Sequence, residues 1–146
     1  VNGILDLWSI ETARMHAGES TVVPRGKPVY LDGGWTVTLR HPDTGDTLGR
    51  LHLEGRAFSG SGAVAEEPHI IDPRTGEYVV PRRGAWALAP DGASADALST
   101  AFTVMSGDEV RRFSSGYPDV TAILLSDDPG DDGLTIIGRE PRLQPL

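Results

Sequence analysis

Residues 85–105 read AWALAPDGASADALSTAFTVM, and this stretch decides the fold of the chain. Its first five residues form a short apolar run, which predicts a buried strand. The following residues repeat apolar side chains at helical spacing and predict a helix from about Ser94 to Met105. Ser94 is the expected N-cap, Asp96 falls in the first turn, where the helix dipole favours an anion, and Gly107 ends the helix. The stretch therefore predicts a strand with a helix packed over its sheet.

A hairpin is expected upstream of this stretch. Residues 34–40 alternate apolar and polar side chains, which is typical of a half-buried strand. Residues 41–46 have the composition of a turn and residues 48–53 alternate again, so the two strands are expected to pair. The small residues of Ala57–Ala63 indicate a loop or a bulged strand end, where another group can approach the backbone closely.

The rest of the chain adds short elements of both kinds. Residues 1–8 indicate a strand already under way, and residues 108–114 indicate a second short helix. Residues 120–125 and 134–137 read as strands joined by an acidic turn. The predicted fold class is α+β, with an antiparallel sheet and one or two helices packed on a face.

Length and termini suggest how the chain is organised. The 146 residues fit one domain, which is expected to span residues 1–140. This domain is expected to be incomplete at its N-terminus, because Val1 already stands inside an apolar run. Residues 141–146 contain two prolines and are expected to form a loose tail.

Composition limits the partners. A net charge of −8 argues against nucleic acid, because an acidic surface repels phosphate backbones. A pyrophosphate ligand would need a metal ion or backbone donors to offset the same field. The absence of cysteine excludes disulfides and thiolate chemistry but leaves the compartment open. No apolar run in the sequence approaches the roughly 20 residues of a membrane span.

The segment 69–76 is the first candidate for chemistry. A histidine, an aspartate, an arginine and a threonine lie within it, around a turn fixed by a proline and a glycine. His69 and Arg74 can donate charge-assisted hydrogen bonds to a phosphate. The alternative is a purely structural turn, in which Asp72 accepts backbone N–H groups and Arg74 lies on the surface.

Asp96 and Thr100 form the second candidate, because residues at i and i+4 share one face of a helix. A carboxylate and a hydroxyl one turn apart can give two hard oxygen ligands to Mg²⁺, with waters and phosphate oxygens completing the shell. The alternative is a capping aspartate and a threonine bonded back to the helix backbone. His16, His41 and His52 have no metal-ligand spacing, and the latter two are expected at the surface.

The two groups, taken in this order, resemble those of the FAD:protein FMN transferase family, known as ApbE. The family pattern His-x-Ile-Asp-Pro-x-Thr-Gly is matched by residues 69–76, and a helix opening like Ala-Asp-Ala-Leu-Ala-Thr-Ala is matched by residues 95–101. The strand that ends at residues 40–42 and the Ser-Gly step at residues 59–60 also look like the family's. The resemblance covers roughly residues 1–125.

This resemblance implies an α+β domain of two related halves, of which the chain is similar to the C-terminal one. It implies Mg²⁺-dependent cleavage of the FAD pyrophosphate, transfer of FMN to a Thr or Ser of a target protein, and release of AMP. By motif match, Asp96 and Thr100 would bind the metal, and His69 would be the catalytic residue near the FAD phosphates. The residues implied to bind the cofactor are Ser59, Gly60, His69 and Thr75, the last of which also shapes the turn.

The chain departs from the family pattern around the expected flavin pocket. The family's N-terminal half lies outside this sequence, and residues 4–6 read Ile-Leu-Asp where the family has Gly-Gly-Asp. Three interpretations stay open. The chain is part of a complete transferase whose other half or second chain is supplied elsewhere, with FAD and an acceptor protein as partners. Alternatively, it is a degenerate relative that binds a flavin, a nucleotide or a protein without transfer, or an interaction module that shares the fold.

Overall fold

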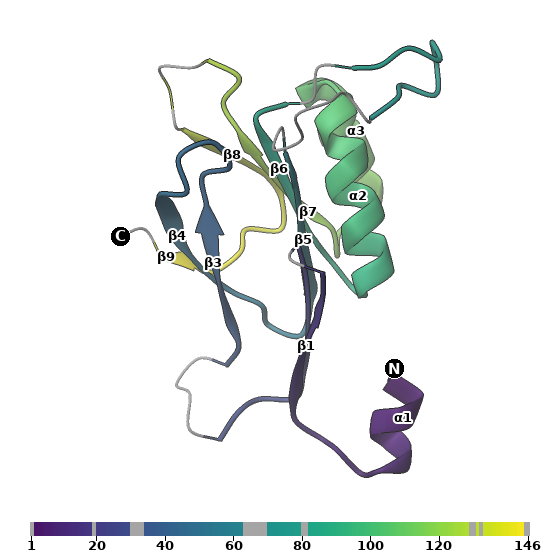
Figure 1. Cartoon of the computed structure of the whole chain (residues 1–146), viewed down its shortest axis with the longest axis vertical. Coiled ribbons are helices and arrows are strands. Elements are labelled where there is room, and N and C mark those ends of the chain that lie inside the picture. The colour runs from purple at the N-terminus through teal and green to yellow at the C-terminus, as the bar shows by residue number, and fades with distance from the viewer. Residues whose placement is uncertain are drawn as a thin grey trace.

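Two antiparallel sheets, with helices on the outer face of the larger one, make up the structure (Figure 1). The computed structural model describes residues 2–18, 20–29, 34–62, 70–79, 82–128, 131 and 133–144. Within these residues the larger sheet has six strands, and each neighbouring pair is antiparallel. In spatial order the strands are β1 (Ala13–Ala17), β2 (Thr21–Arg25), β5 (Ala57–Gly62), β6 (Gly84–Ala89), β7 (Thr121–Leu125) and β8 (Leu134–Gly138).

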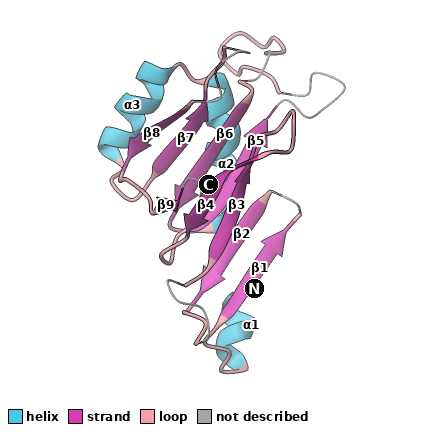
Figure 2. Ribbon diagram, turned by 90° about the vertical axis from the view of Figure 1, so that its left-hand side faces the viewer, coloured by secondary structure: helices cyan, strands magenta, loops and turns pink. Residues whose placement is uncertain are grey.

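A smaller sheet and the helices lie on opposite faces of the larger sheet (Figure 2). The small sheet consists, in spatial order, of β3 (Thr36–Arg40), β4 (Thr47–His52) and β9 (Leu143–Gln144). The helices on the other face are α2 (Gly92–Val104) and α3 (Gly107–Gly116). The predicted α+β class, with an antiparallel sheet and two helices packed on it, is confirmed.

Strand β6 separates two hydrophobic cores. The prediction of a buried strand here is confirmed, because all of its residues are buried. Ala85 and Ala87 pack in the cluster that contains Phe102 of α2, whereas Trp86 and Leu88 pack in the cluster between the two sheets. Successive side chains of a strand point to opposite faces. The alanines therefore let the helix approach the sheet closely, while the large side chains fill the space beneath the small sheet.

The predicted hairpin is confirmed by β3 and β4, which pair antiparallel with a register shift at its turn end. Leu39 of β3 and Leu51 of β4 are fully buried in the core between the sheets. Trp35, just before β3, is partly buried against the same core and donates its indole N–H to the Arg25 carbonyl at 3.2 Å. The apolar face that alternation predicted is thus the face that covers the large sheet.

Two histidines of this hairpin are buried, so the expectation that they lie at the surface is wrong. His41 is 2% exposed and His52 is 6% exposed. The His41 Nδ1 atom accepts two backbone N–H groups of the turn at 3.1 and 3.3 Å, and its Nε2 lies 2.7 Å from the Nη2 of Arg83. The imidazole ring therefore accepts hydrogen bonds from backbone N–H groups of the turn, and this role explains why the ring lies beneath the hairpin.

The segment expected to be a loop or a bulged strand end is a regular strand, β5, in the middle of the large sheet. The packing around Gly60 explains why a small residue is needed at this position. A Cβ atom at this position would lie 2.5 Å from the Cδ1 atom of Trp86 on the neighbouring strand. Close approach to the backbone was predicted correctly, but the approaching group is the protein's own indole ring.

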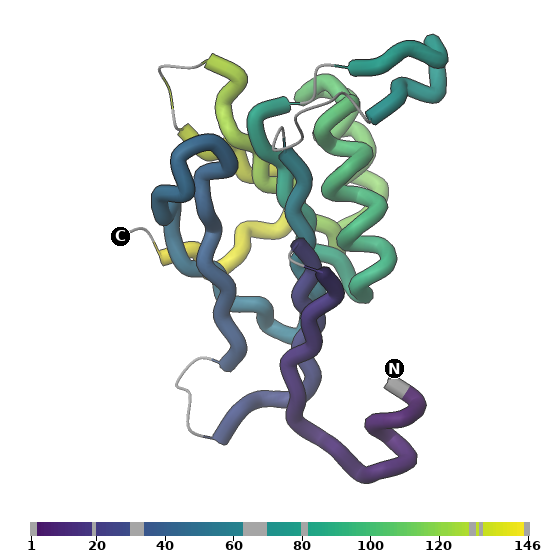
Figure 3. The backbone as a smooth tube through the Cα atoms, viewed as in Figure 1, coloured from purple at the N-terminus to yellow at the C-terminus, as the bar shows by residue number. Residues whose placement is uncertain are grey.

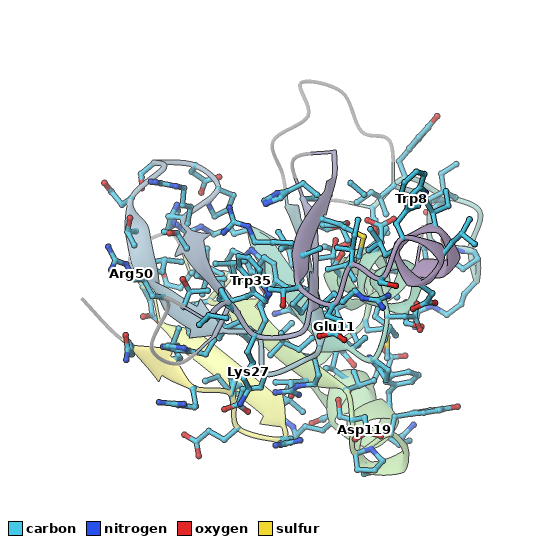
Figure 4. The ribbon with its side chains drawn as sticks, turned by 90° about the horizontal axis from the view of Figure 1, so that it is seen from below. Trp8, Glu11, Lys27, Trp35, Arg50 and Asp119 are labelled. Atoms are coloured by element: carbon cyan, nitrogen blue, oxygen red, sulfur yellow. The ribbon has the colours of Figure 1, made fainter. Side chains whose placement is uncertain are left out.

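The strand expected over residues 1–8 is also wrong, because Asn2–Leu7 form a short helix, α1. A short apolar run does not by itself distinguish a strand from a helix. Here the backbone N–H of Trp8 donates to the Ile4 carbonyl at 3.2 Å, which is a helical i to i−4 bond. Helix α1 lies at the end of the molecule (Figure 3), and Asp6 of this helix forms an ion pair with Arg25 of β2 at 2.6 Å. Trp8 beside it is 73% exposed, whereas Trp35 lies nearer the middle of the molecule (Figure 4).

The C-terminal segment expected to be loose contributes a strand. Leu143 and Gln144 form β9 and pair with Leu51 and Arg50 of β4. Leu143 also packs against the core between the sheets. The burial of the Leu143 side chain and the pairing with β4 therefore keep Leu143 and Gln144 in place, although the neighbouring prolines suggested a loose tail.

Both predicted helices are present, with different boundaries. The N-cap of α2 is Asp91, whose carboxylate accepts the backbone N–H of Ser94 at 2.9 Å and its hydroxyl at 2.8 Å. Asp96 therefore lies beyond the first turn, and Gly107 opens α3 and does not end α2. No helix in the described part of the chain is long and apolar enough to cross a membrane.

Candidate functional site

Helix α2 packs on β2 and β5 and carries the predicted metal-binding pair over a group of hydroxyls from the sheet. Asp96 and Thr100 lie one helical turn apart, and both are exposed. Thr21 of β2 and Ser59 and Ser61 of β5 face this part of the helix. The site therefore combines an exposed carboxylate and hydroxyl with polar groups at the helix–sheet boundary.

The carboxylate of Asp96 is held from the sheet side. Its Oδ1 atom accepts hydrogen bonds from Thr21 Oγ1 at 3.2 Å and from Ser59 Oγ at 3.3 Å. The two hydroxyl oxygens lie 2.8 Å apart. Each hydroxyl carries a single proton, so three close contacts share two protons, and the bonds to the charged carboxylate are the stronger ones.

The hydroxyl of Thr100 belongs to a second group of contacts. Its Oγ1 lies 3.0 Å from Ser61 Oγ and donates to the backbone carbonyl of Asp96 at 3.3 Å. Ser61 Oγ also lies 3.1 Å from Ser99 Oγ. The back-bonded threonine considered from the sequence is thus present. A hydroxyl that donates its proton keeps its lone pairs, so this contact leaves the oxygen able to bind a metal.

The two β5 residues expected to bind the cofactor, Ser59 and Gly60, lie on opposite faces of the strand. Ser59 is fully buried beneath Asp96, and Gly60 is on the opposite face of the strand, against Trp86. Sequence reasoning missed Ser61, which is partly exposed and next to Thr100. Alternation along a strand places residues 59 and 61 on one face, and this signal was lost because the segment was interpreted as a loop.

The turn at residues 72–76 is built around one carboxylate. Asp72 is 7% exposed, and its Oδ1 accepts the backbone N–H of Arg74 at 2.9 Å. The Arg74 guanidinium lies 2.7 Å from Asp72 Oδ2 and 2.6 Å from Glu109 Oε1 on α3. Gly76 has a φ of 75°, a left-handed conformation that favours glycine. The structural role considered for Asp72 is observed, and Arg74 ties the turn to α3.

The electrostatics of this turn follow from the same contacts. Hydrogen bonds from the Arg74 side chain and backbone hold the pKa of Asp72 below its usual range, and the pairing raises the pKa of Arg74. Hydrogen bonds from the backbone and side chain of Ser106 lower the pKa of Glu109, with a further contribution from Arg74. All three groups are therefore charged near neutral pH.

The remaining predicted residues of this turn are placed differently. Thr75 is exposed, and its hydroxyl accepts the backbone N–H of Glu77 at 3.3 Å. His69, the predicted catalytic residue, lies outside the described residues. The turn meets the N-terminal end of α3 through Glu109, whereas Asp96 contacts the middle of the sheet.

A cavity of about 520 Å³ lies between this turn and the C-terminal end of α2. Arg74, Arg82 and Arg83 line it, and each lies within 3.3 Å of a carboxylate oxygen. Sequence reasoning missed Arg82 and Arg83, although two adjacent arginines in an acidic chain were an available signal. The lining of the cavity thus combines three arginines with two carboxylates, Glu109 and Asp127.

Most of the residues that form this arrangement fall within the match to one protein family. The model of the ApbE family matches residues 3–124, which is most of the chain. The chain belongs to the ApbE family. The match includes the turn at residues 72–76 and helix α2, which carries Asp96 and Thr100.

Solved structures of ApbE proteins share the fold. The ApbE protein of Thermotoga maritima is 25% identical, with a TM-score of 0.66 over 86% of this chain and 42% of that chain. The flavin transferase ApbE from Vibrio cholerae is 21% identical, with a TM-score of 0.65 over 92% of this chain and 44% of that one. This chain therefore spans less than half the length of these ApbE structures. A search of curated proteins found no significant match.

The residues of this ApbE chain fit a magnesium ion as partial ligands. Asp96 and Thr100 offer a carboxylate and a hydroxyl oxygen, the hard ligands that Mg²⁺ prefers, at an exposed position. Among the described residues there is no group of three or more His, Asp or Glu that could form a complete protein cage. Mg²⁺ usually keeps several waters and takes one or two carboxylates together with substrate phosphates. The chemistry of these two side chains is therefore compatible with a Mg²⁺ ion that keeps waters or phosphate oxygens as its other ligands.

Proposed function

We propose that this chain forms the metal-binding part of a Mg²⁺-dependent flavin transferase, which moves FMN from FAD to a Thr or Ser of a target protein. Membership of the ApbE family supports flavin transfer. The observation that carries the magnesium site is the exposed pair Asp96 and Thr100, with the carboxylate held in one orientation by two hydroxyls.

The charge of the chain explains why such a site would need a cation. The chain has a net charge of −8, and a pyrophosphate would bring further negative charge to the exposed carboxylate of Asp96. A carboxylate and a pyrophosphate that lie close together repel each other unless a cation lies between them. When bound, Mg²⁺ would neutralise charge that develops on the phosphate oxygens.

The proposed reaction is a substitution at the phosphorus on the FMN side of the pyrophosphate. The acceptor hydroxyl oxygen forms a bond to this phosphorus, and the bond from phosphorus to the bridging oxygen breaks. AMP leaves with the bridging oxygen, and the hydroxyl proton passes to a base. His69 remains the residue predicted for this proton transfer. Asp96 and Thr100 position the phosphates by holding the cation, and Ser59, Gly60 and Thr75 remain predicted cofactor-binding residues.

The flavin pocket is proposed to be completed by other residues. The solved ApbE structures are more than twice as long as the aligned part of this chain, which leaves their remaining residues without a counterpart here. An N-terminal half or a second chain would supply the flavin contacts. The described residues provide the metal pair and the turn.

Mass spectrometry tests the proposal directly. The gene product that contains this chain is incubated with FAD, Mg²⁺ and protein extract from the source cells, and Thr- and Ser-containing peptides are searched for the added mass of FMN. Asp96→Asn and Thr100→Val should each reduce transfer by about a hundredfold, because several kcal/mol of charge stabilisation are lost. Asp108→Asn is the matched control, since Asp108 is an exposed residue of α3 whose ion pair is to Arg111.

The result also separates the alternative function. FMN attached to a peptide, and lost in both variants, would support transfer. No FMN adduct, combined with an increase in Tm on adding FAD, would support a non-catalytic relative that binds flavin or nucleotide. Neither adduct nor Tm shift would contradict both functions and favour an interaction module.

A further inference from the structure

The buried hydroxyls beneath Asp96 form a defined pair. Thr21 and Ser59 are direct cross-strand partners in the β2–β5 register, so their side chains leave the sheet on the same face at the same level. Thr21 is 5% exposed and Ser59 is fully buried. Their oxygens lie 2.8 Å apart, and both contact Asp96 Oδ1. The pair and the carboxylate therefore form a triangle of oxygens across three elements of the chain.

Apolar side chains also lie at the helix–sheet boundary that contains this pair. Ala57 and Ala89 of the sheet and Ala95 of the helix form a small buried cluster at the same helix–sheet boundary. Burying a hydroxyl among such side chains is unfavourable unless it makes a hydrogen bond. Both hydroxyls donate to the same oxygen, Asp96 Oδ1, so the carboxylate is the acceptor that the two buried groups share.

We infer that Thr21 and Ser59 are positioning residues that hold Asp96 for a divalent cation; this inference rests on the metal site of the proposed function. Both hydrogen bonds go to Oδ1, which leaves Oδ2 to bind the cation. An exposed aspartate on a helix otherwise samples several rotamers, and ordering it on binding costs conformational entropy. Two donors fixed in the sheet select one orientation in advance, as outer-shell partners do for other metal ligands.

The inference predicts a loss of cation affinity when either hydroxyl is removed. Thr21→Val and Ser59→Ala keep side-chain volume similar and should each weaken cation binding about tenfold, the lower end of the effect typical of outer-shell partners. Thr21→Ser retains the hydroxyl and should restore binding close to that of the parent protein. Mn²⁺ is the probe, and bound and free Mn²⁺ are counted by electron paramagnetic resonance on the gene product that contains this chain.

A matched variant controls for the loss of a buried hydroxyl as such. Thr103 of α2 is 5% exposed. Its hydroxyl donates to the backbone carbonyl of Thr100 at 2.7 Å and does not contact the Asp96 carboxylate. Thr103→Val should therefore lower stability to a similar extent but leave the Mn²⁺ affinity unchanged. Circular dichroism verifies that each variant is folded.

The outcomes distinguish the inference from the function on which it rests. Weaker Mn²⁺ binding in Thr21→Val and Ser59→Ala, with recovery in Thr21→Ser, would support it. Unchanged binding in folded Thr21→Val and Ser59→Ala would overturn it while the metal site stands. An equal loss in Thr103→Val would also overturn it, because the effect would then be general loosening of α2. Absence of Mn²⁺ binding in the parent protein would overturn the metal site and the inference together, whereas FMN transfer is judged separately by mass spectrometry.

Discussion

The two faces of strand β5 differ in chemistry although they are one residue apart in the sequence. Ser59 and Ser61 point to α2 and meet Asp96 and Thr100. Phe58, on the other face, packs in the core between the sheets, where Gly60 makes room for Trp86. The second face is apolar and closely packed, so it mainly stabilises the fold. The first is polar and partly open, so substitutions there should affect binding more than stability.

The largest expected effect is on the apolar face. Trp86→Ala should lower the free energy of unfolding by about 3–5 kcal/mol, because it removes a large buried side chain and leaves a cavity. Urea unfolding followed by circular dichroism measures this. Trp8→Ala is the matched control, since Trp8 is 73% exposed, and it should change stability by less than about 0.5 kcal/mol. Similar losses in the two variants would contradict the division between faces.

A smaller effect is expected when the same face is overfilled. In Gly60→Ala the new Cβ would lie 2.5 Å from Trp86 Cδ1. The same ring also packs over Gly84, where an added Cβ would lie 2.8 Å from the indole. The substitution should lower the free energy of unfolding by about 1–3 kcal/mol. Gly116→Ala, at an open position, is the control. If Gly60→Ala unfolds at the same urea concentration as Gly116→Ala, the indole does not constrain this strand.

These two faces also show what the sequence could predict. Periodicity identified the helix over Asp96 and Thr100 and the hairpin that includes Leu39, because apolar repeats report which face is buried. It failed on β5, because Ser and Gly carry no apolar signal although Ser59 is fully buried. The motif match predicted Asp96 and Thr100 as metal ligands. The contact between Thr21 and Asp96 could not be predicted, because it joins residues that are distant in the sequence and depends on strand order.

The helix side depends on local hydrogen bonds as well as on packing, and α3 offers a test. Ser106 caps this helix in a reciprocal capping box with Glu109, whose carboxylate also binds Arg74. Ser106→Ala should lower the free energy of unfolding by about 1 kcal/mol, less than either change on the apolar face. Ser115→Ala, which removes an exposed hydroxyl of the same helix, is the control. Equal urea midpoints in the two variants would show that the cap contributes nothing.

The smallest effect is expected in the pH dependence of the turn that Arg74 joins to α3. The folded-state pKa of Asp72 lies below its ordinary value of 3.8, and that of Glu109 lies below 4.5. Below about pH 4.5 the unfolded chain therefore binds more protons than the folded one, so stability present above this pH is lost as the pH falls toward the folded-state values. Arg74→Met removes a partner of both carboxylates.

In Arg74→Met the pKa of Asp72 should move up toward 3.8, and the loss of stability with falling pH should become shallower. Nuclear magnetic resonance titration of the carboxyl carbons measures the first change, and urea unfolding at several pH values measures the second. Arg111→Met is the matched control, because its ion pair with Asp108 is solvent-exposed and distinct from that of the turn. If Asp72 titrates at its ordinary value in the parent protein, the ion pair does not hold the turn in solution, and the turn must instead be kept in place by its backbone bonds from Thr75 and Gly76 to the Asp72 carbonyl.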